Sequence, residues 1–224
     1  MFSFTINRRL ADFALGYVFQ HAVPAMQLVI IATSFGWLAS GNLLWFAVGA
    51  VCTILTFVPA MCISDAAIRA ATDLCVSALV FAHVFFGMHV GLYETSVVYD
   101  KLIHALGCGA IAVIVIAFVS RYCSHRRIDL PVPFLFLFVT GIVVSLGTLW
   151  EVFEFAVDRT GLFQSQKGLS DTMLDLMADV LGAGVATGLI IAGMCRNYFP
   201  HALQAHLRRL PYHGPKHSIG ENDA

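Results

Sequence analysis

The sequence predicts an all-α membrane protein, a polytopic bundle of about six transmembrane helices with both termini in the cytoplasm. Its 224 residues are 58% hydrophobic and 12% charged, whereas soluble domains are roughly 25% charged. The mean hydropathy is +0.79. A nucleic-acid binder needs a basic face, and this chain has a net charge of −1. Composition therefore excludes a soluble globular enzyme, a disordered chain and a nucleic-acid binder, and membrane lipid is the expected partner.

The expected spans follow from length. A helix needs about 20 mostly apolar residues to cross the hydrocarbon layer. The stretches that meet this requirement are residues 17–39, 42–63, 70–92, 100–120, 132–157 and 172–195. We therefore expect one transmembrane domain over residues 1–200, whose motif-bearing part is about 97–190, and a flexible cytoplasmic tail over 201–224.

The breaks between these spans fall where turn-forming or charged residues gather. In chain order they are Ser40 to Asn42, Asp65 to Arg69, Gly91 to Ser96, Arg121 to Pro133 and Thr160 to Ser170. Each break separates two apolar stretches of span length, so the count of spans does not depend on the choice of any single boundary.

Basic residues set the expected orientation, because short cytoplasmic loops of membrane proteins are rich in Lys and Arg. With six spans and both termini inside, ten of the 13 Lys and Arg residues lie on the cytoplasmic side. The three on the outer side are Lys101, Arg159 and Lys167. The sequence thus predicts a multi-pass protein of the inner (plasma) membrane.

Acidic residues gather on the opposite, outer side. Eight of the 14 Asp and Glu residues lie there: Glu94, Asp100, Glu151, Glu154, Asp158, Asp171, Asp175 and Asp179. At 3.6 residues per turn, Asp100 shares a helix face with His104. The acids of the fifth and sixth spans are likewise spaced three or four residues apart. Each of the last three spans therefore carries one polar stripe that starts at the same membrane surface.

Depth makes some of these carboxylates costly. Glu151 and Asp179 lie about 10 Å below the outer surface at 1.5 Å per residue, and an Asp near the bilayer centre costs about 2.5–3.5 kcal/mol. Such groups face one another or a wet cavity, and they repel unless protons or a cation intervene. Mg²⁺, Ca²⁺, Mn²⁺ or, with a His, Zn²⁺ suits such ligands. Two possibilities thus stay open: protons on some of these carboxyls, or a divalent cation as cofactor, for which Asp175, Asp179 and Glu151 are the candidate ligands. Simple solvation at the helix ends is the alternative for Asp158 and Asp171.

Three motifs in this region resemble the VanZ-like group of bacterial membrane proteins and the YjdF-like inner-membrane proteins. Asp100-Lys101-Leu102-Ile103-His104 matches the VanZ-like pattern D-K-x-x-H. Glu151-Val152-Phe153-Glu154, with Arg159 nearby, resembles E-x-x-Q followed by Arg, and residues 175–182 resemble D-x-x-x-N-x-x-G. Acids replace both amides, which favours the YjdF-like side. The resemblance covers about residues 97–190 and implies an envelope-associated membrane protein without defining a reaction.

The leading hypothesis is an outward-facing site that binds or processes an envelope lipid or a lipid-linked head group. His104, Glu151 and Asp179 are then the candidate catalytic residues. The candidate substrate-binding residues are Asp100, Lys101, Glu154 and Arg159, of which the two cations would meet an anionic head group. A proton- or cation-coupled transporter and a non-catalytic assembly protein are the alternatives. The chain has no nucleophile elbow, P-loop, HExxH or CxxC motif, so whether it is an enzyme stays open.

Overall fold

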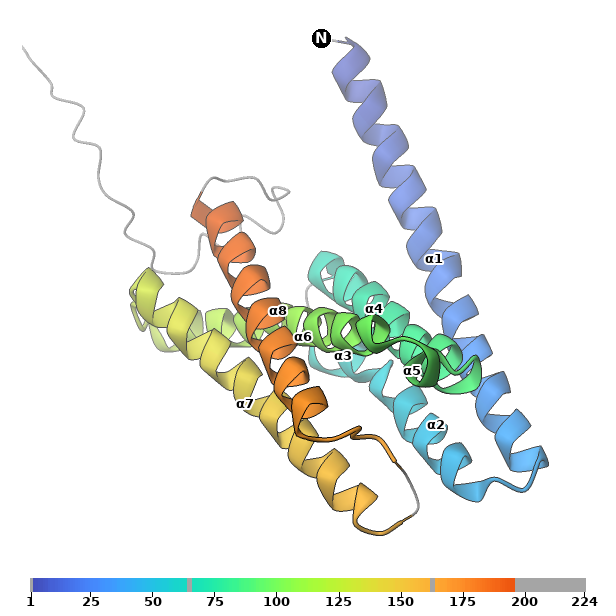
Figure 1. The fold of residues 1–224 in the computed structure, drawn as a ribbon. Coiled ribbons are helices and arrows are strands. Elements are labelled where there is room, and N and C mark those ends of the chain that lie inside the picture. Colours follow the sequence, from blue (N-terminus) through green and yellow to red (C-terminus); the bar gives the residue numbers. More distant parts are fainter. Residues whose placement is uncertain (1, 64–65, 162–163, 196–224) are drawn as a thin grey trace, which may run out of the picture.

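The computed structural model is all-helical in the part of the chain that it describes, residues 2–63, 66–161 and 164–195. Figure 1 shows the elements in chain order: α1 (Phe2–Ala39), α2 (Leu43–Leu55), α3 (Val58–Cys62), α4 (Ala66–Phe81), the π-helix η1 (Ala82–His89), α5 (Leu92–Thr95), α6 (Val97–Arg126), α7 (Val132–Asp158) and α8 (Leu169–Cys195). Within these described residues, six helical stretches are long and apolar enough to cross a membrane. The predicted six-helix membrane bundle is confirmed, whereas the expected tail over 201–224 lies outside the described residues.

The candidate spans run over His21–Ala39, Leu43–Met61, Arg69–His89, Val97–Cys123, Val132–Asp158 and Leu169–Met194. Two of them are not single α-helices, which the hydropathy pattern does not reveal. The second breaks after α2, and Pro59 stands in the first turn of α3, where its missing N–H costs nothing. The third passes from α4 into the π-helix η1.

The π-helix docks two tyrosines that follow it in the chain. The ring of Tyr93 fills the space beside Gly87, where an added Cβ would lie 2.2 Å from that ring. The hydroxyl of Tyr99 donates a hydrogen bond to the carbonyl of Ala82 over 2.7 Å. π-helical turns are rare and are frequently found at functional sites. Here the wide turn fixes the start of α6 against the third span.

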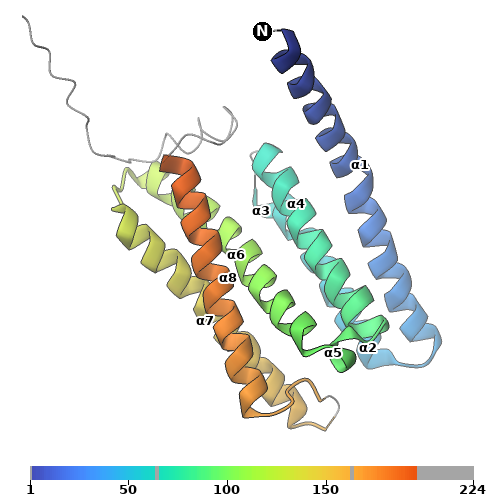
Figure 2. The ribbon, with the colours of Figure 1, turned by 45° about the horizontal axis from the view of Figure 1, so that its top comes forward.

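The helices pack in two groups, and Figure 2 shows α6, α7 and α8 side by side, next to the group formed by α1, α2 and α4. The core of the first group is apolar and comes from all three of its helices: Cys108, Ala112, Ile116, Val119, Cys123, Leu135, Val139, Val143, Ala183 and Ile191. The outer faces are apolar as well, since Leu149, Leu181 and Leu189 are each more than 60% exposed. A bundle that is apolar outside and inside suits a lipid environment.

Helices α6 and α8 start at the same end of the bundle and touch at the backbone. At Gly182, an added Cβ would lie 2.1 Å from the carbonyl oxygen of Ala105. Because that neighbour is backbone, it cannot move aside as a side-chain tip would. Small residues permit such close helix contact in membranes, and this contact sets the spacing at which side chains of α6 meet those of α8.

We expect Gly182→Ala to destabilise the bundle, because its methyl group would push α6 away from α8. Overpacking of this kind costs about 1–3 kcal/mol. Gly184→Ala is the matched control on the same helix, because its Cβ would meet nothing within 4 Å. Thermal unfolding of both variants in the same detergent measures the difference. Equal unfolding midpoints for the two variants would show that the close contact has no energetic weight.

Candidate functional site

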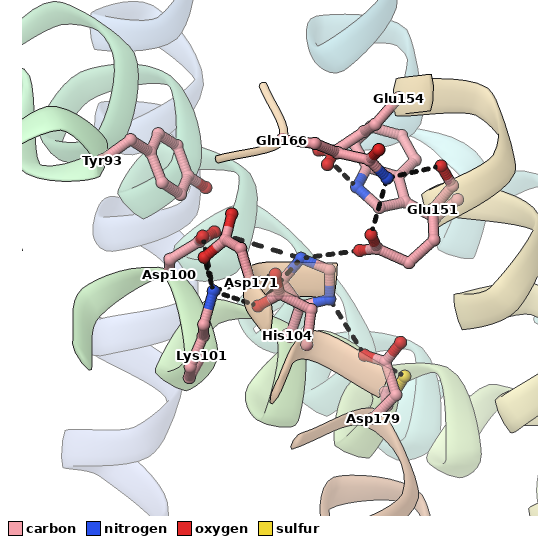
Figure 3. A network of polar contacts seen from close by, with 12 residues as sticks. Tyr93, Asp100, Lys101, His104, Glu151, Glu154, Gln166, Asp171 and Asp179 are labelled. Atoms are coloured by element: carbon pink, nitrogen blue, oxygen red, sulfur yellow. Dashed lines mark hydrogen bonds and ion pairs between the residues drawn. The ribbon is translucent and has the colours of Figure 1, made fainter. Parts of the chain in front are cut away.

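His104 lies between the last three spans and faces carboxylates on both of its ring nitrogens (Figure 3). Its Nδ1 is 3.1 Å from Oδ1 of Asp179 on α8. Its Nε2 is 3.6 Å from Glu151 on α7, 3.8 Å from Asp175 on α8 and 4.0 Å from Asp100 on α6. The imidazole is thus the point at which the polar stripes of three helices meet.

Lys101, the next residue along the chain from Asp100, is held by three carboxylates. Its Nζ lies 3.1 Å from Asp100 and 2.8 Å from Asp175, and it also pairs with Asp171. The other oxygen of Asp171 accepts a hydrogen bond from the backbone N–H of Lys167. The sequence assigned Lys101 to an anionic head group, whereas the structure places its ammonium group among acids of the protein itself.

Burial is deepest where the carboxylates approach His104. The relative exposure is 3% for Glu151, 3% for Asp175 and 1% for Asp179. In the described part of the chain, the cations that contact the cluster are Lys101 and, when protonated, His104. They face five carboxylates, so the ionised cluster has an excess of negative charge that protons or a bound cation must offset.

The local sequence explains why these side chains converge. On α6, Asp100, His104 and Cys108 are spaced four residues apart and share one face. The thiol of Cys108 donates to Oδ1 of Asp179 over 3.2 Å. On α7, Gly147 lies one turn before Glu151 and gives Asp179 its space, since a Cβ on Gly147 would lie 2.3 Å from Oδ2 of Asp179. The glycine therefore lets α7 close over the buried acid.

The connection between α7 and α8 covers the cluster with polar contacts. Gln166 Nε2 donates to Oε2 and to the backbone carbonyl of Glu151, both over 3.0 Å. The backbone N–H groups of Ser165 and Gln166 donate to the carboxylate of Asp158. Asp158 therefore organises the connection. Sequence reasoning missed Gln166 because a loop residue belongs to no periodic pattern, whereas the four-residue spacing on α6 offered a signal for Cys108.

Two of the expected substrate-binding residues make other contacts. Glu154 accepts a hydrogen bond from the indole Nε1 of Trp150 over 3.0 Å. The guanidinium group of Arg159 lies 5.9 Å from the ring centroid of Phe155. Within the described residues neither is among the ion-pair partners of His104, so the structure brings together the other six candidates and not these two.

Comparison with known proteins places the chain in a family. The model of a family described as "Predicted membrane protein (DUF2238)" matches residues 22–196. The chain belongs to this DUF2238 family. An uncharacterized protein of Thermotoga maritima is 36% identical over 112 residues, which cover 50% of this chain and 57% of that relative. No solved structure matches the chain.

The DUF2238 match includes every residue of the cluster. The VanZ-like and YjdF-like resemblance is a finer assignment, on which these comparisons are silent. The residues of the cluster include one group with the spacing of a metal site: ligand atoms of Asp100, His104 and Asp175 all lie within 4.8 Å of one another. This group shares Asp175 with the ligand set expected from the sequence, and the structure places Asp179 on the opposite ring nitrogen of His104.

We expect Gly147→Ala to displace the carboxylate of Asp179 and so to destabilise this DUF2238 protein by about 1–3 kcal/mol. In an Asp179→Ala background the new methyl group meets no carboxylate, so the same change should cost much less. The double-mutant cycle, read as unfolding free energies, should therefore show a coupling of about 0.5–3 kcal/mol.

Gly141→Ala is the control for this cycle, because it lies on the same helix and its Cβ would meet nothing within 4 Å. Its effect should be the same with and without Asp179→Ala. If the costs of Gly147→Ala are equal in both backgrounds, the glycine is not what accommodates Asp179.

Proposed function

We propose that this DUF2238 protein binds a divalent cation through His104 Nε2 and the carboxylates of Asp100 and Asp175, and that Glu151 moves toward the ion as a further carboxylate. The observation that carries the proposal is the set of distances around Nε2, which are 3.6, 3.8 and 4.0 Å to oxygens from three different helices. These distances are too long for hydrogen bonds. The separations of Asp100 and Asp175 from Nε2 suit atoms that share a central ion, since ligand atoms of these two residues and His104 all lie within 4.8 Å of one another.

Simple geometry supports this reading. Ligand atoms about 2.1 Å from a Zn²⁺ or Mg²⁺ ion are about 3.4 Å apart at a tetrahedral angle and up to about 4.2 Å apart when opposite. The separations around Nε2 fall in this range. One nitrogen with several carboxylate oxygens suits Zn²⁺ or Mn²⁺ and leaves Mg²⁺ and Ca²⁺ as competitors.

An unpartnered oxygen points to the same ligand. Glu151 is 3% exposed, and among the described residues its Oε1 has no hydrogen-bond partner, although its Oε2 accepts from Gln166. Figure 3 shows that this carboxylate is directed toward His104. Buried polar atoms are nearly always paired, so this oxygen marks a place where a further positive group would be stabilised.

Asp179 contacts the other ring nitrogen of His104, Nδ1. A metal-bound imidazole commonly donates its other N–H to a carboxylate, which fixes the ring and its tautomer. Nδ1 of His104 meets Asp179 in this way over 3.1 Å, and Cys108 holds the same carboxylate. With the proton on Nδ1, the lone pair of Nε2 is free for a cation. Asp179 is thus a positioning residue in this proposal.

The polar cluster belongs to one end of the bundle. Further along the same three helices the core consists of Ala112, Ile116, Val139, Val143 and Ala183. An apolar plug of this kind favours a site that opens to one side over a proton or cation pathway through the membrane. The unpartnered oxygen of Glu151 likewise favours a binding site over a cluster that only joins helices.

The finer proposal combines the cation with an envelope lipid. If the end of the bundle that carries the cluster faces outward, as the distribution of basic residues predicts, the ion is within reach of head groups in the outer leaflet. The motifs that resemble VanZ-like and YjdF-like proteins agree with an envelope role. Because Lys101 is engaged by three carboxylates, the bound cation itself would meet an anionic or lipid-linked head group.

Glu151→Gln tests the cation site, because it keeps the size of the side chain and removes its charge. We expect wild-type protein in nanodiscs to unfold at a higher temperature with Mn²⁺ or Zn²⁺, since a ligand at about 100 times its dissociation constant stabilises by about 2.7 kcal/mol. In the variant, titration calorimetry should show an affinity at least about tenfold lower. A tenfold change corresponds to about 1.4 kcal/mol.

Glu94→Gln is the matched control, because Glu94 is an exposed carboxylate at the same end of the bundle. It should leave both the affinity and the thermal shift unchanged. The proposal is wrong if millimolar Mn²⁺, Zn²⁺, Mg²⁺ and Ca²⁺ all leave the wild-type protein unshifted, or if Glu151→Gln and Glu94→Gln bind equally well.

Orientation has its own test. Glu94 lies in α5, just before the start of α6, and His125 lies in the last turn of α6. Glu94→Cys and His125→Cys therefore place exposed thiols at opposite ends of this span. In intact cells a membrane-impermeant maleimide should label the first variant above the wild-type background, and the second only after permeabilisation. The reverse labelling pattern would place the cluster on the cytoplasmic side.

A further inference from the structure

Lys101 and the proposed cation use two of the same ligands. The ammonium group of Lys101 contacts Asp100 and Asp175, and both carboxylates also face Nε2 of His104. We infer that Lys101 is a built-in competitor for the cation site, which sets its affinity and reserves it for divalent ions. This inference rests on the cation site proposed above and goes beyond it by assigning a specificity-determining residue.

The carboxylates around the ammonium group of Lys101 already bind one positive charge. Three carboxylates from two helices, Asp100 of α6 with Asp171 and Asp175 of α8, surround a nitrogen whose side chain is 16% exposed. Short contacts to ionised oxygens are the strong kind of hydrogen bond. The structure therefore shows how these carboxylates hold a single positive charge that is tethered to α6.

The single positive charge of Lys101 decides which ions can compete with it for these carboxylates. Na⁺ or K⁺ carries the same charge as the ammonium group but must be captured from solution, whereas Lys101 is always present at a high effective concentration. A divalent ion brings twice the charge into a site of low dielectric, where the electrostatic difference is large. The site should therefore exchange its internal cation for a divalent ion and ignore a monovalent one.

Exchange needs only a small movement of Lys101. Asp171 holds the ammonium group but is not among the proposed ligands, and it precedes Asp175 by one turn at the start of α8. When the ion draws on Asp100 and Asp175, Lys101 retains Asp171 as its partner. The lysine therefore moves outward along α8 by about one helical turn at most, which is about 5.4 Å.

Lys101→Met removes the competing charge and adds no ligand for hard cations. The expected result is opposite in sign to structural damage: the protein without cation becomes less stable, while its affinity for Mn²⁺ or Zn²⁺ rises at least about tenfold. Lys101→Arg keeps the charge and should bind like the wild type. Lys167→Met removes a positive charge at the same end of the bundle. In the described structure the ammonium group of Lys167 contacts only the backbone carbonyl of Tyr93. This variant should therefore also bind the cation like the wild type.

Competition with monovalent salt gives a second readout. Binding of Mn²⁺ should be insensitive to K⁺ in the wild type beyond the general effect of ionic strength, which a choline salt reports. In Lys101→Met, K⁺ should compete at least several-fold more strongly than choline. A structural role for Lys101 predicts no such difference between the two salts.

Each outcome has one meaning. If the wild type binds divalent ions and Lys101→Met binds them equally or more weakly, the inference is wrong and the cation site stands. If neither protein binds them, the proposed function fails and takes the inference with it. If Lys101→Met does not fold, the test is NMR of wild-type protein whose lysines carry ¹³C-methyl groups. Mn²⁺ or Zn²⁺ must then shift or broaden the resonance of Lys101 more than that of Lys167, and equal changes overturn the inference.

Discussion

The burial of carboxylates in an apolar bundle is the constraint from which the rest of the structure follows. An ion removed from water loses several kcal/mol of hydration even after relaxation, and Glu151, Asp175 and Asp179 are almost fully buried. The protein offsets this cost at one place, around the imidazole of His104. The polar stripes of three helices point to it, and the close contact at Gly182 brings two of these helices to the distance that the imidazole requires.

The two groups of helices contribute differently to the cluster. The last three spans supply its charged side chains, whereas the π-helix η1 of the third span holds the segment that leads into α6. Tyr93, which hydrogen-bonds His83 over 2.6 Å, and Tyr99 both dock on the π-helix η1. This anchoring gives the first turn of α6, where Asp100 and Lys101 lie, a fixed position relative to the third span.

The sequence predicts the spans and the polar stripes, because both are periodic features of a helix. It does not predict which ring nitrogen of His104 meets which acid, since that depends on the rotation of three helices about their axes. Glu154 shows the limit: it lies three residues after Glu151, about 60° away around the helix, and pairs with Trp150 instead of joining the imidazole. Gln166 and the π-helix were not predicted because neither leaves a pattern in hydropathy.

The order of the spans has a consequence for biogenesis. Chains are made from the N-terminus, so α6 enters the bilayer before the residues of α8 have been synthesised. At that stage Asp175 and Asp179 are absent, and Lys101 can pair with its neighbour Asp100, which it still contacts in the finished bundle. This adjacent pair leaves the first turns of α6 without net charge. Lys101 therefore has a partner within its own helix before the last span is made.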